Sequence, residues 1–334
     1  MTAPPNPQTH EALAATAAEF WDREVVERTH KNWMAVDEVR AYINTSVGGD
    51  ASAWPMNWFV REYGGRVFAR GLTIGCGPGD LERDVIRRGI CKEIDAFDIS
   101  EGSLAIARAR AAEEGIADRI YYFTADFNAP SLPKHAYDIV FFPWSLHHVA
   151  KLEKLYRAVM RTLRPDGLLY FEEYIGPSSR QWTPEIFRAQ LATFASLPRE
   201  WKTVDALPYP INPHDPSEAI RSGEILPQLT IGFDLEHKRD FGGNLLATLY
   251  PFIDWSVAPP DAITQLIDAE RALLRDGAAS YHAVVVARPK RGLRGWVARV
   301  RYFFEPKARR VWSAVARSYR FGSAGAPLRG AEKR

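Results

Sequence analysis

A glycine-rich loop followed by an acidic residue carries the clearest chemical signal in this sequence. The loop, Gly75 to Asp80, reads GCGPGD and comes directly after the apolar residues Leu72 to Ile74. Such residues predict the end of a buried strand, and the glycines let the backbone turn tightly against a ligand. Asp98 ends a second apolar run, Ile94 to Phe97, where a carboxylate can accept hydrogen bonds from a ribose diol. Loop and acid together predict a site for an adenosine-containing ligand.

The spacing of the glycines separates two classes of such ligands. A dinucleotide-binding loop has the pattern Gly-x-Gly-x-x-Gly or Gly-x-Gly-x-x-Ala. Here the glycines stand at 75, 77 and 79, and Asp80 occupies the third dinucleotide position. Nicotinamide and flavin cofactors are therefore disfavoured. S-adenosylmethionine has no pyrophosphate to place on a helix N-terminus, so this loop has only to approach a short amino-acid moiety.

Strand-like and helix-like segments alternate from residue 67 to residue 175, which predicts a parallel, doubly wound α/β sheet. In such a sheet the ligand lies over the carboxyl ends of the strands. The expected strands are Val67–Ile74, Glu93–Asp98, Ile120–Thr124, Tyr137–Phe142, Leu168–Glu172, Phe233–Arg239 and Tyr281–Arg288. The expected helices are Asp80–Arg88, Glu101–Glu114, Leu152–Leu163, closed by the turn Arg164–Gly167, and Ala262–Arg275.

Three segments are predicted to surround this sheet. Residues 1–62 are helical in pattern and dense in aromatic residues, which predicts a cap or lid over the strand ends. Prolines interrupt residues 176–232, which we interpret as an insertion after the fifth strand, within a domain spanning 63–288. Residues 289–334 are predicted to form a basic amphipathic helical extension.

Composition indicates an ordinary soluble globular protein. Hydrophobic residues make up 46% of the chain and charged residues 25%, and no window approaches the roughly 18 continuous apolar residues of a membrane span. Because the N-terminus lacks the basic and apolar regions of a signal peptide, we expect a cytoplasmic location. Cys76 and Cys91 are the two cysteines, too few for a disulfide framework, and both are expected to be reduced.

The net charge of +2 hides a strong segregation of charge. Residues 288–334 hold fourteen Lys and Arg against two Glu, a net charge of +12, so residues 1–287 sum to −10. Within the basic part, Trp296, Val300 and Phe303 recur at helical spacing. A basic amphipathic helix of this kind can lie on an anionic membrane surface, or pack its apolar face on the acidic body or on a second subunit.

Five short motifs follow one another between residues 67 and 175. They are the glycine loop, Asp98-Ile99-Ser100, Ala125-Asp126-Phe127, Pro143-Trp144-Ser145-Leu146-His147-His148 and Leu163-Arg164-Pro165-Asp166-Gly167. In this order they resemble the class I S-adenosylmethionine-dependent methyltransferases of the small-molecule type. The resemblance implies a Rossmann-like sheet of seven mostly parallel strands, with the last strand inserted antiparallel between two others. It implies cofactor contacts at Gly75, Cys76, Gly77, Pro78, Gly79, Asp98, Ile99, Ser100, Asp126, Phe127, Pro143 and Ser145.

A second resemblance concerns the acceptor, and one position departs from the family pattern. The segments Glu173–Ser178, Ser222–Pro227 and Phe241–Gly243 look like a bacterial subgroup often met beside glycan-building enzymes. Many family members carry an acidic residue two positions before the first glycine of the loop, where this chain has Thr73. We therefore expect the methionine ammonium to be held by backbone carbonyls, water or another carboxylate.

Methyl transfer from a sulfonium is a direct displacement, so the protein mainly aligns the acceptor and removes its proton if the acceptor is a hydroxyl. His147 and His148 follow the fourth expected strand, and the ordinary imidazole pKa of about 6.5 suits a base. Of the two we prefer His148 as the general base. The alternative for either histidine is packing beneath the loop or a bond to a backbone carbonyl.

Candidate acceptor contacts come from both ends of the predicted domain. Glu173 and Tyr174 end the fifth expected strand at the same rim, and Trp33 and Tyr42 are the aromatic residues of the cap most suited to reach it. The spacing of carboxylates and histidines does not compel a metal site.

The sequence predicts methyl transfer from S-adenosylmethionine to a small-molecule or glycan-like acceptor, most simply at a hydroxyl. N-methylation of a small amine and a non-catalytic S-adenosylmethionine-binding interaction protein are the alternatives. A nucleic-acid partner is not expected, because Phe142-Pro143-Trp144-Ser145 stands where enzymes that methylate bases favour Asn or Asp followed by Pro-Pro-aromatic.

Overall fold

The fold is taken from a computed structural model of the chain. It describes residues 18, 20–22, 32–212, 215 and 217–305. The predicted cap and the predicted C-terminal extension therefore lie partly outside the described residues.

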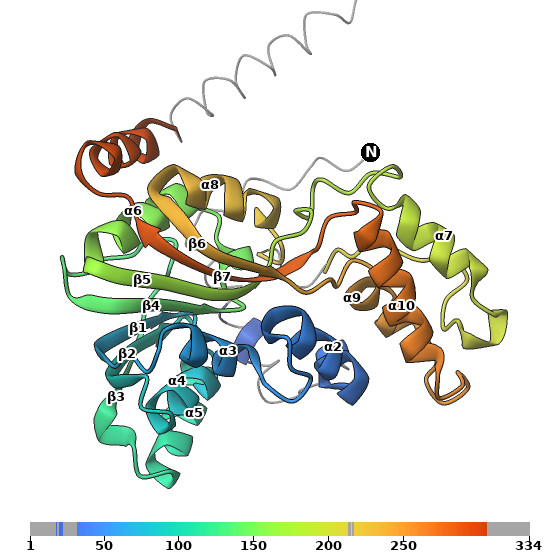
Figure 1. The fold of residues 1–334 in the computed structure, drawn as a ribbon, viewed down its shortest axis with the longest axis horizontal. Coiled ribbons are helices and arrows are strands. Elements are labelled where there is room, and N and C mark those ends of the chain that lie inside the picture. Colours follow the sequence, from blue (N-terminus) through green and yellow to red (C-terminus); the bar gives the residue numbers. More distant parts are fainter. Residues whose placement is uncertain (1–17, 19, 23–31, 213–214, 216, 306–334) are drawn as a thin grey trace, which may run out of the picture.

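Within the described part of the chain, seven strands form one sheet in the order β3-β2-β1-β4-β5-β7-β6 (Figure 1). The strands are β1 (Phe68–Ile74), β2 (Cys91–Asp98), β3 (Ile120–Thr124), β4 (Tyr137–Pro143), β5 (Leu163–Tyr174), β6 (Phe233–Asp240) and β7 (His282–Pro289). Neighbouring strands from β3 to β5 pair in parallel, and β7 pairs antiparallel with both β5 and β6. The predicted seven-stranded, mostly parallel sheet with an inserted antiparallel strand is confirmed.

Helices cover both faces of this sheet, with α3, α4 and α5 on one face and α6 and α8 on the other (Figure 1). The helices are α2 (Asp37–Gly48), α3 (Pro55–Glu62), α4 (Asp80–Arg87), α5 (Glu101–Glu113), α6 (Leu152–Thr162), α7 (Arg188–Ser196), α8 (Ile225–Gly232), α9 (Leu246–Leu249) and α10 (Ala262–Arg275). Short 3₁₀ helices are η1 (Trp33–Ala35), η2 (Ala117–Arg119), η3 (Leu146–His148), η4 (Arg199–Trp201), η5 (Ser222–Glu224) and η6 (Tyr250–Phe252).

Strand β4 shows how the sequence builds two cores at once. Successive side chains of a strand point to opposite faces of the sheet. Ile139 and Phe141 therefore join the core under α4 and α5, while Val140 and Phe142 join the core under α6 and α8. A strand buried on both faces reads as a continuous apolar run, which is why its position was predictable.

Strand β5 corrects the prediction of a turn before the fifth strand. Tyr137 of β4 pairs with Leu163, and Ile139 pairs with Leu168, so residues 164–167 loop out inside β5 as a bulge. The intervening Asp138 explains the correction, because both of its oxygens accept hydrogen bonds from the Arg164 guanidinium, at 2.9 and 3.0 Å. The turn residues are thus held to β4 and remain part of the strand.

The described part of the predicted cap packs on the sheet through aromatic residues. The Phe59 ring of α3 lies 5.1 Å from Tyr170 of β5 and 6.3 Å from Phe68 of β1, between ring centroids. Aromatic burial of this kind gives a large apolar contact for a short helix. At Phe59, therefore, an aromatic residue of the predicted cap packs against the sheet.

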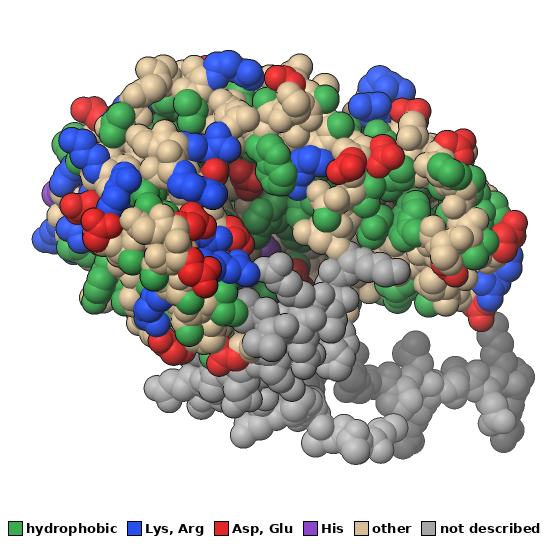
Figure 2. Space-filling model, turned by 90° about the horizontal axis from the view of Figure 1, so that it is seen from below, with side chains coloured by type: hydrophobic (Ala, Val, Ile, Leu, Met, Phe, Trp, Pro, Cys, Tyr) green, Lys and Arg blue, Asp and Glu red, His purple; other side chains and the backbone are tan. Residues whose placement is uncertain are grey.

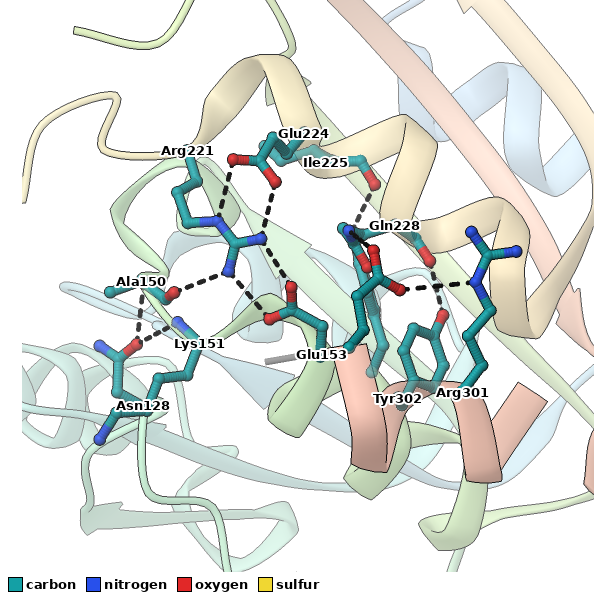
Figure 3. Close-up of polar contacts among 12 residues, drawn as sticks. Asn128, Ala150, Lys151, Glu153, Arg221, Glu224, Ile225, Gln228, Arg301 and Tyr302 are labelled. Atoms are coloured by element: carbon teal, nitrogen blue, oxygen red, sulfur yellow. Dashed lines mark hydrogen bonds and ion pairs between the residues drawn. The ribbon is translucent and has the colours of Figure 1, made fainter. Parts of the chain in front are cut away.

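A polar network holds the predicted insertion against α6 (Figure 3). The Arg221 guanidinium donates to both carboxylate oxygens of Glu153, at 2.7 and 2.9 Å, and to Glu224 at 2.7 Å. It also donates to the Ala150 carbonyl at 2.9 Å. Because these bonds join α6 to η5, they fix the chain that precedes Arg221.

The described start of the C-terminal extension is a helix over residues 292–305. Its inner side packs on the body through Ala298 and Tyr302, and the Tyr302 hydroxyl donates to the Gln228 carbonyl of α8 at 2.6 Å (Figure 3). No helix among the described residues combines the length and apolar character needed to cross a bilayer.

Replacing Arg221 by Ala is expected to lower the free energy of unfolding by about 3–5 kcal/mol, because the change removes the guanidinium from a buried carboxylate. The side chains of Arg221 and Glu153 are only 16% and 4% exposed. Urea unfolding measures the effect. Arg199→Ala, in an ion pair whose Asp205 partner is 89% exposed, is the matched control and should cost less than about 1 kcal/mol. Equal costs for the two variants would contradict the prediction.

Candidate functional site

The glycine-rich loop joins β1 to α4 at the carboxyl edge of the sheet. Gly75, Gly77 and Gly79 have φ angles of +72°, +52° and +75°, in the left-handed region that favours glycine. The Gly75 amide donates to the Phe97 carbonyl at 2.8 Å, and the Gly77 amide donates to Asp98 Oδ2 at 2.8 Å. A Cβ on Gly77 would meet no atom of the described residues within 4 Å, so this glycine borders open space in that part of the chain.

Asp98 ends β2 with its carboxylate held by the backbone. Besides Oδ2 on Gly77, its Oδ1 accepts a hydrogen bond from the Ser100 amide at 3.0 Å. Burial raises the pKa of Asp98, and the amides of Ser100, Gly77 and Ile99 oppose that rise. These bonds fix the carboxylate at the edge where the ribose contact was predicted, and that contact stays a prediction.

A short N-terminal stretch, residues 20–22, reaches two points of this edge. Asp22 Oδ1 accepts hydrogen bonds from the Ser100 hydroxyl at 2.5 Å and from the Gly102 amide at 3.0 Å. The Trp21 ring lies 5.3 Å from the His148 ring in an edge-to-face contact. The stretch therefore contacts the end of β2 and the segment after β4 at once.

The structure brings the predicted cofactor residues together along the ends of β1 to β4. The Ser145 hydroxyl donates to the Ile74 carbonyl at 2.6 Å, which joins the segment after β4 to the end of β1. A Cβ on Gly75 would lie 3.7 Å from the Phe127 ring, and Asp126 Oδ1 accepts from the Asn128 amide at 2.7 Å. The remaining predicted residues lie in the loop (Cys76 and Pro78), after β2 (Ile99) and at the last position of β4 (Pro143).

A buried carboxyl lies next to Thr73, the position that departs from the family pattern. Glu82, in the first turn of α4, is fully buried with its side chain against Thr73. Burial raises the pKa of Glu82 to about 7, and the contact with Thr73 opposes the rise. The acid missing from β1 is thus present on the next helix. The signal that could have found it is a glutamate three residues after Gly79, where α4 turns toward the sheet.

Trp144 follows β4 in a strained conformation. Its φ of +56° lies in the left-handed region, which is unusual for a bulky residue. Its amide donates to the Glu172 carbonyl at 3.1 Å, and its ring lies 5.7 Å from His282 and 6.1 Å from Phe241. The surrounding structure therefore holds this ring at the strand ends despite the strain.

Glu173 holds the turn after β4 to the end of β5. Its Oε2 accepts a hydrogen bond from the Leu146 amide at 2.6 Å, and its Oε1 accepts from the Tyr174 amide at 2.7 Å and contacts His147 Nδ1. The side chain is fully buried. Because both oxygens are engaged within the protein, the geometry favours a role for Glu173 in orienting His147; its predicted contact with the acceptor stays a prediction.

His147 and His148 lie side by side in η3, with ring centroids 4.0 Å apart. His148 Nδ1 lies 3.0 Å from the Ser217 hydroxyl and 3.5 Å from Asp215 Oδ2. Each imidazole is thus held through Nδ1, and each Nε2 faces the Glu218 carboxylate, at 3.8 and 3.9 Å. Asp215, Ser217 and Glu218 come from the predicted insertion and were not identified from the sequence.

The two histidines have opposite electrostatic environments. Burial disfavours a charge on His147, but the carboxylates of Glu173 and Glu218 outweigh it and raise the pKa of His147 to about 9. Burial and the positive charge of His147 lower the pKa of His148 to about 4. At neutral pH the pair therefore carries one positive charge, on His147.

His282 is a site residue that sequence reasoning missed. It begins β7, and because β7 is antiparallel its first residue lies at the edge where β4 and β5 end, paired with Tyr174. The rings of Trp33, Trp144, Tyr174 and Phe241 surround it at 5.3 to 5.7 Å. Burial lowers the pKa of His282 to about 3, so this imidazole is neutral. The predicted direction of the last strand was the signal that could have located it.

Two of the predicted acceptor contacts, Trp33 and Tyr174, thus lie beside His282, whereas Tyr42 is placed differently. Tyr42 of α2 is buried, with its hydroxyl bonded to Glu270 of α10 and its ring 5.1 Å from the Arg271 guanidinium. These contacts join α2 to α10. The predicted contact of Tyr42 with an acceptor stays a prediction.

A cavity of about 400 Å³ opens between α3, α4 and the ends of β4 and β5. Tyr170 donates to the Glu172 carboxylate at its wall at 2.6 Å, and burial raises the pKa of Glu172. Figure 2 shows the molecule hollowed between the sheet and the lobe that carries α10, with hydrophobic, acidic and histidine side chains facing the hollow. The lining residues of the cavity include Trp54, Met56, Asp80, Asp84, Arg88, Trp144 and Glu172.

Comparison with known proteins finds a family resemblance for the part of the chain that contains the glycine loop and the histidine pair. A family model described as a methyltransferase domain matches residues 72–167, which contain the glycine loop, Asp98, Asp126 and the histidine pair. Residues 72–167 are therefore similar to a methyltransferase domain. Glu173, Glu218 and His282 lie beyond the matched residues.

Curated relatives match part of this chain. A ubiquinone biosynthesis O-methyltransferase of Aeromonas salmonicida (strain A449) is 31% identical over 115 residues, which cover 34% of this chain and 47% of that protein. The ubiquinone/menaquinone biosynthesis C-methyltransferase UbiE of Azotobacter vinelandii (strain DJ / ATCC BAA-1303) is 28% identical over 159 residues, 46% of this chain and 62% of that protein. The chain thus spans about half to three fifths of these relatives' lengths.

A solved structure is also similar to this chain. The geranyl diphosphate C-methyltransferase from Streptomyces coelicolor A3(2) is 15% identical with a TM-score of 0.49, and the match covers 86% of this chain and 100% of that chain.

Replacing Glu82 by Gln is expected to stabilise the protein at pH 8 and to have little effect at pH 4.5. The folded-state pKa of about 7 lies above the ordinary value of 4.5, so the stability kept by the neutral carboxyl below pH 4.5 is lost as the pH rises through 7. Glutamine abolishes this loss, a gain of up to about 3 kcal/mol at pH 8. Urea unfolding at both pH values measures it.

Glu113→Gln, at an exposed position of α5, is the matched control and should change stability equally at the two pH values. A Glu82→Gln effect that does not depend on pH would contradict the prediction.

Proposed function

We propose that this protein transfers a methyl group from S-adenosylmethionine to a hydroxyl of a small-molecule or glycan-like acceptor, with His148 accepting the proton. The observation that supports this most is the histidine pair after β4, each ring held through Nδ1 and turned toward Glu218 through Nε2. The pair lies close to the glycine loop, because Ser145 bonds to the last residue of β1.

The residues around the loop fit S-adenosylmethionine. Gly77 borders open space, and each Asp98 oxygen that accepts a backbone hydrogen bond has a second lone pair for a ribose hydroxyl. Asp126 lies at the end of β3, where the adenine amino group is expected. The Glu82 carboxyl behind the loop is suited to favour the methionine ammonium electrostatically. When bound, S-adenosylmethionine supplies an electrophilic methyl group on its sulfonium.

The geometry around the histidines favours His148 as the proton acceptor. With the Nδ1 proton of His148 directed at Ser217 and Asp215, the lone pair is on Nε2. His147, bonded to the Glu173 carboxylate, holds its proton and serves to position and polarise the pair. A hydroxyl acceptor needs such a base as its oxygen attacks, whereas an amine that is already neutral does not.

The cavity beside α3 supports an acceptor with several hydroxyl groups. The indole faces of Trp54 and Trp144 provide apolar contact, and the carboxyl groups of Asp80, Asp84 and Glu172 provide hydrogen-bond acceptors. We assign Trp33 and Tyr174 to the acceptor side because both flank His282. The names of the curated relatives describe methylation in quinone biosynthesis, so phenols are included among the acceptors to be tested.

The proposal is tested by incubating the full chain with labelled S-adenosylmethionine and sugar, phenol and amine acceptors. Label is expected in a hydroxyl acceptor. His148→Gln should then lower kcat by about 10²- to 10⁴-fold, the usual contribution of a positioned base, while the Kd of the cofactor changes less than about threefold. His135→Gln is the matched control because His135 lies at the far end of β4, bonded to the Leu163 carbonyl, and this variant should keep parental activity.

Two outcomes favour the alternatives. If the double variant His147→Gln, His148→Gln keeps most of its activity on an amine, the protein is an N-methyltransferase. If the chain binds the cofactor without turnover on any acceptor, and residues 289–334 are required to capture a protein partner, it is a non-catalytic interaction protein.

We also propose a peripheral membrane contact through the C-terminal helix. Trp296 and Val297 follow Leu293 by three and four residues, so the three side chains lie on one side of the helix. Leu293, Trp296 and Val297 are 76%, 57% and 50% exposed. Large apolar side chains within a segment of net charge +12 are the features of a helix that lies on an anionic surface.

Replacing Leu293, Trp296 and Val297 together by Ser is expected to reduce flotation with vesicles containing phosphatidylserine several-fold, because both apolar insertion and burial of the indole are lost. Neutral vesicles should bind the parent weakly. A triple Ser variant at Ile186, Leu191 and Val257, which are 41%, 38% and 51% exposed, is the matched control. Unchanged flotation together with loss of a dimer in light scattering would instead assign these residues to a contact between subunits.

A further inference from the structure

Three donor atoms beside the proposed active site converge on one point. They come from His147, His148 and Glu218, one possible ligand atom from each, and lie within 4.8 Å of one another. Glu218 Oε1 lies 3.8 Å from His147 Nε2, and Oε2 lies 3.9 Å from His148 Nε2. Hydrogen bonds between such atoms are shorter, at about 2.7–3.2 Å. The donors therefore face one another across a gap.

The size of this gap matches a single metal ion. Nitrogen and carboxylate ligands lie about 2.0–2.2 Å from zinc, so two ligand atoms on one ion are separated by roughly 3 to 4.2 Å. The separations of 3.8 and 3.9 Å fall in this range. Small side-chain movements would bring all three donors to bonding distance.

The other nitrogen of each ring is already bound, as in most metal-ligating histidines. Glu173 holds His147 through Nδ1, and the Ser217 hydroxyl holds His148 through Nδ1. A carboxylate or hydroxyl on the far nitrogen keeps the proton on Nδ1. Nε2 of the neutral His148 then has a lone pair for the ion, and Nε2 of His147 gains one when the ion displaces its proton. The arrangement thus includes the outer contacts of a metal site as well as its ligands.

The loop that carries Glu218 is rigidly attached to its surroundings. The Ile220 amide donates to the His147 carbonyl at 3.1 Å, and the Ala219 carbonyl accepts from the Ser179 amide at 2.8 Å. Arg221 anchors the loop to buried Glu153 of α6 (Figure 3). The backbone that follows Glu218 is therefore fixed next to His147.

The charge around the pair also favours a cation. Three carboxylates, from Glu173, Asp215 and Glu218, surround the two imidazoles. Asp215 is 1% exposed, and among the described residues its Oδ2 has no hydrogen-bond partner although it lies 3.5 Å from His148 Nδ1. Buried carboxylates of this kind are stabilised by a neighbouring divalent ion.

We propose that His147, His148 and Glu218 bind one divalent transition metal ion. Two imidazole nitrogens with one carboxylate are the ligand set of zinc sites that keep a fourth position open. An acceptor oxygen in that position would become more acidic, a role that rests on the proposed function. The ion in the loaded protein and His148 in the metal-free protein are then two ways of activating the same hydroxyl.

Metal binding is tested on the full chain without any acceptor. The protein is treated with a chelator, dialysed and titrated with zinc chloride by calorimetry, and with cobalt(II) by visible absorption. We expect one zinc per chain with a Kd of about 1 µM or tighter, and a cobalt spectrum of a four- or five-coordinate site. Glu218→Gln should weaken zinc binding at least about 10-fold.

His237→Ala is the matched control, because His237 also lies near a glutamate, with Nε2 3.5 Å from Glu62 Oε1, but in a pair outside the proposed site. This variant should bind zinc like the parent. Circular dichroism checks that Glu218→Gln is folded, and His148→Ala provides a second ligand variant.

Stoichiometry well below one, or equal zinc affinity in the parent and both ligand variants, overturns the proposal. These readouts need no methyl transfer, so an inactive protein that binds zinc refutes the proposed function and leaves the metal site standing. An active protein that binds no zinc refutes the metal site alone.

Discussion

The buried carboxylate of Glu173 is the interaction on which the geometry of the candidate site depends. It ties the backbone after β4, at Leu146, to the end of β5, at Tyr174, and it orients His147 with the same two oxygens. Trp144 precedes this turn with a positive φ, a conformation that persists only when neighbouring contacts enforce it. A buried charge bound by two amides and an imidazole is fully compensated, so one side chain fixes both the turn and the histidine pair.

The candidate site has two halves with different origins along the chain. The matched methyltransferase domain, residues 72–167, contributes the glycine loop, Asp98 and the histidines. Glu173, Glu218 and His282 come from later segments, which fold back over the same edge of the sheet. The half that is expected to hold the cofactor therefore lies within the matched residues, while several residues around the histidines lie outside them. Fold alone says little about the acceptor for this reason.

Local sequence patterns were sufficient to predict most strands and helices of the fold. Strands such as β3 and the helix α10 were predicted with their observed bounds, because apolar periodicity reports burial directly. The bulge in β5 was missed because it depends on Asp138 binding Arg164, a contact between strands that no local pattern contains. Glu218 was missed for the same kind of reason, because its position depends on the closure of a long insertion. His282 was within reach of the sequence through the expected antiparallel last strand, but its aromatic neighbours come from distant segments and became visible only with tertiary structure.

The insertion of β7 between β5 and β6 also sets the order in which the strands can pair during synthesis. Among the described strands, β6 pairs only with β7, so it has no strand neighbour until residues 282–289 have left the ribosome. Domains fold as the chain emerges, N-terminal parts first, and the strands β1 to β5 are complete by residue 174. His282 is carried by the strand that arrives last. The nascent chain can therefore complete the edge around the glycine loop long before the aromatic surroundings of His282 exist, and a truncated translation product would lack that half of the site.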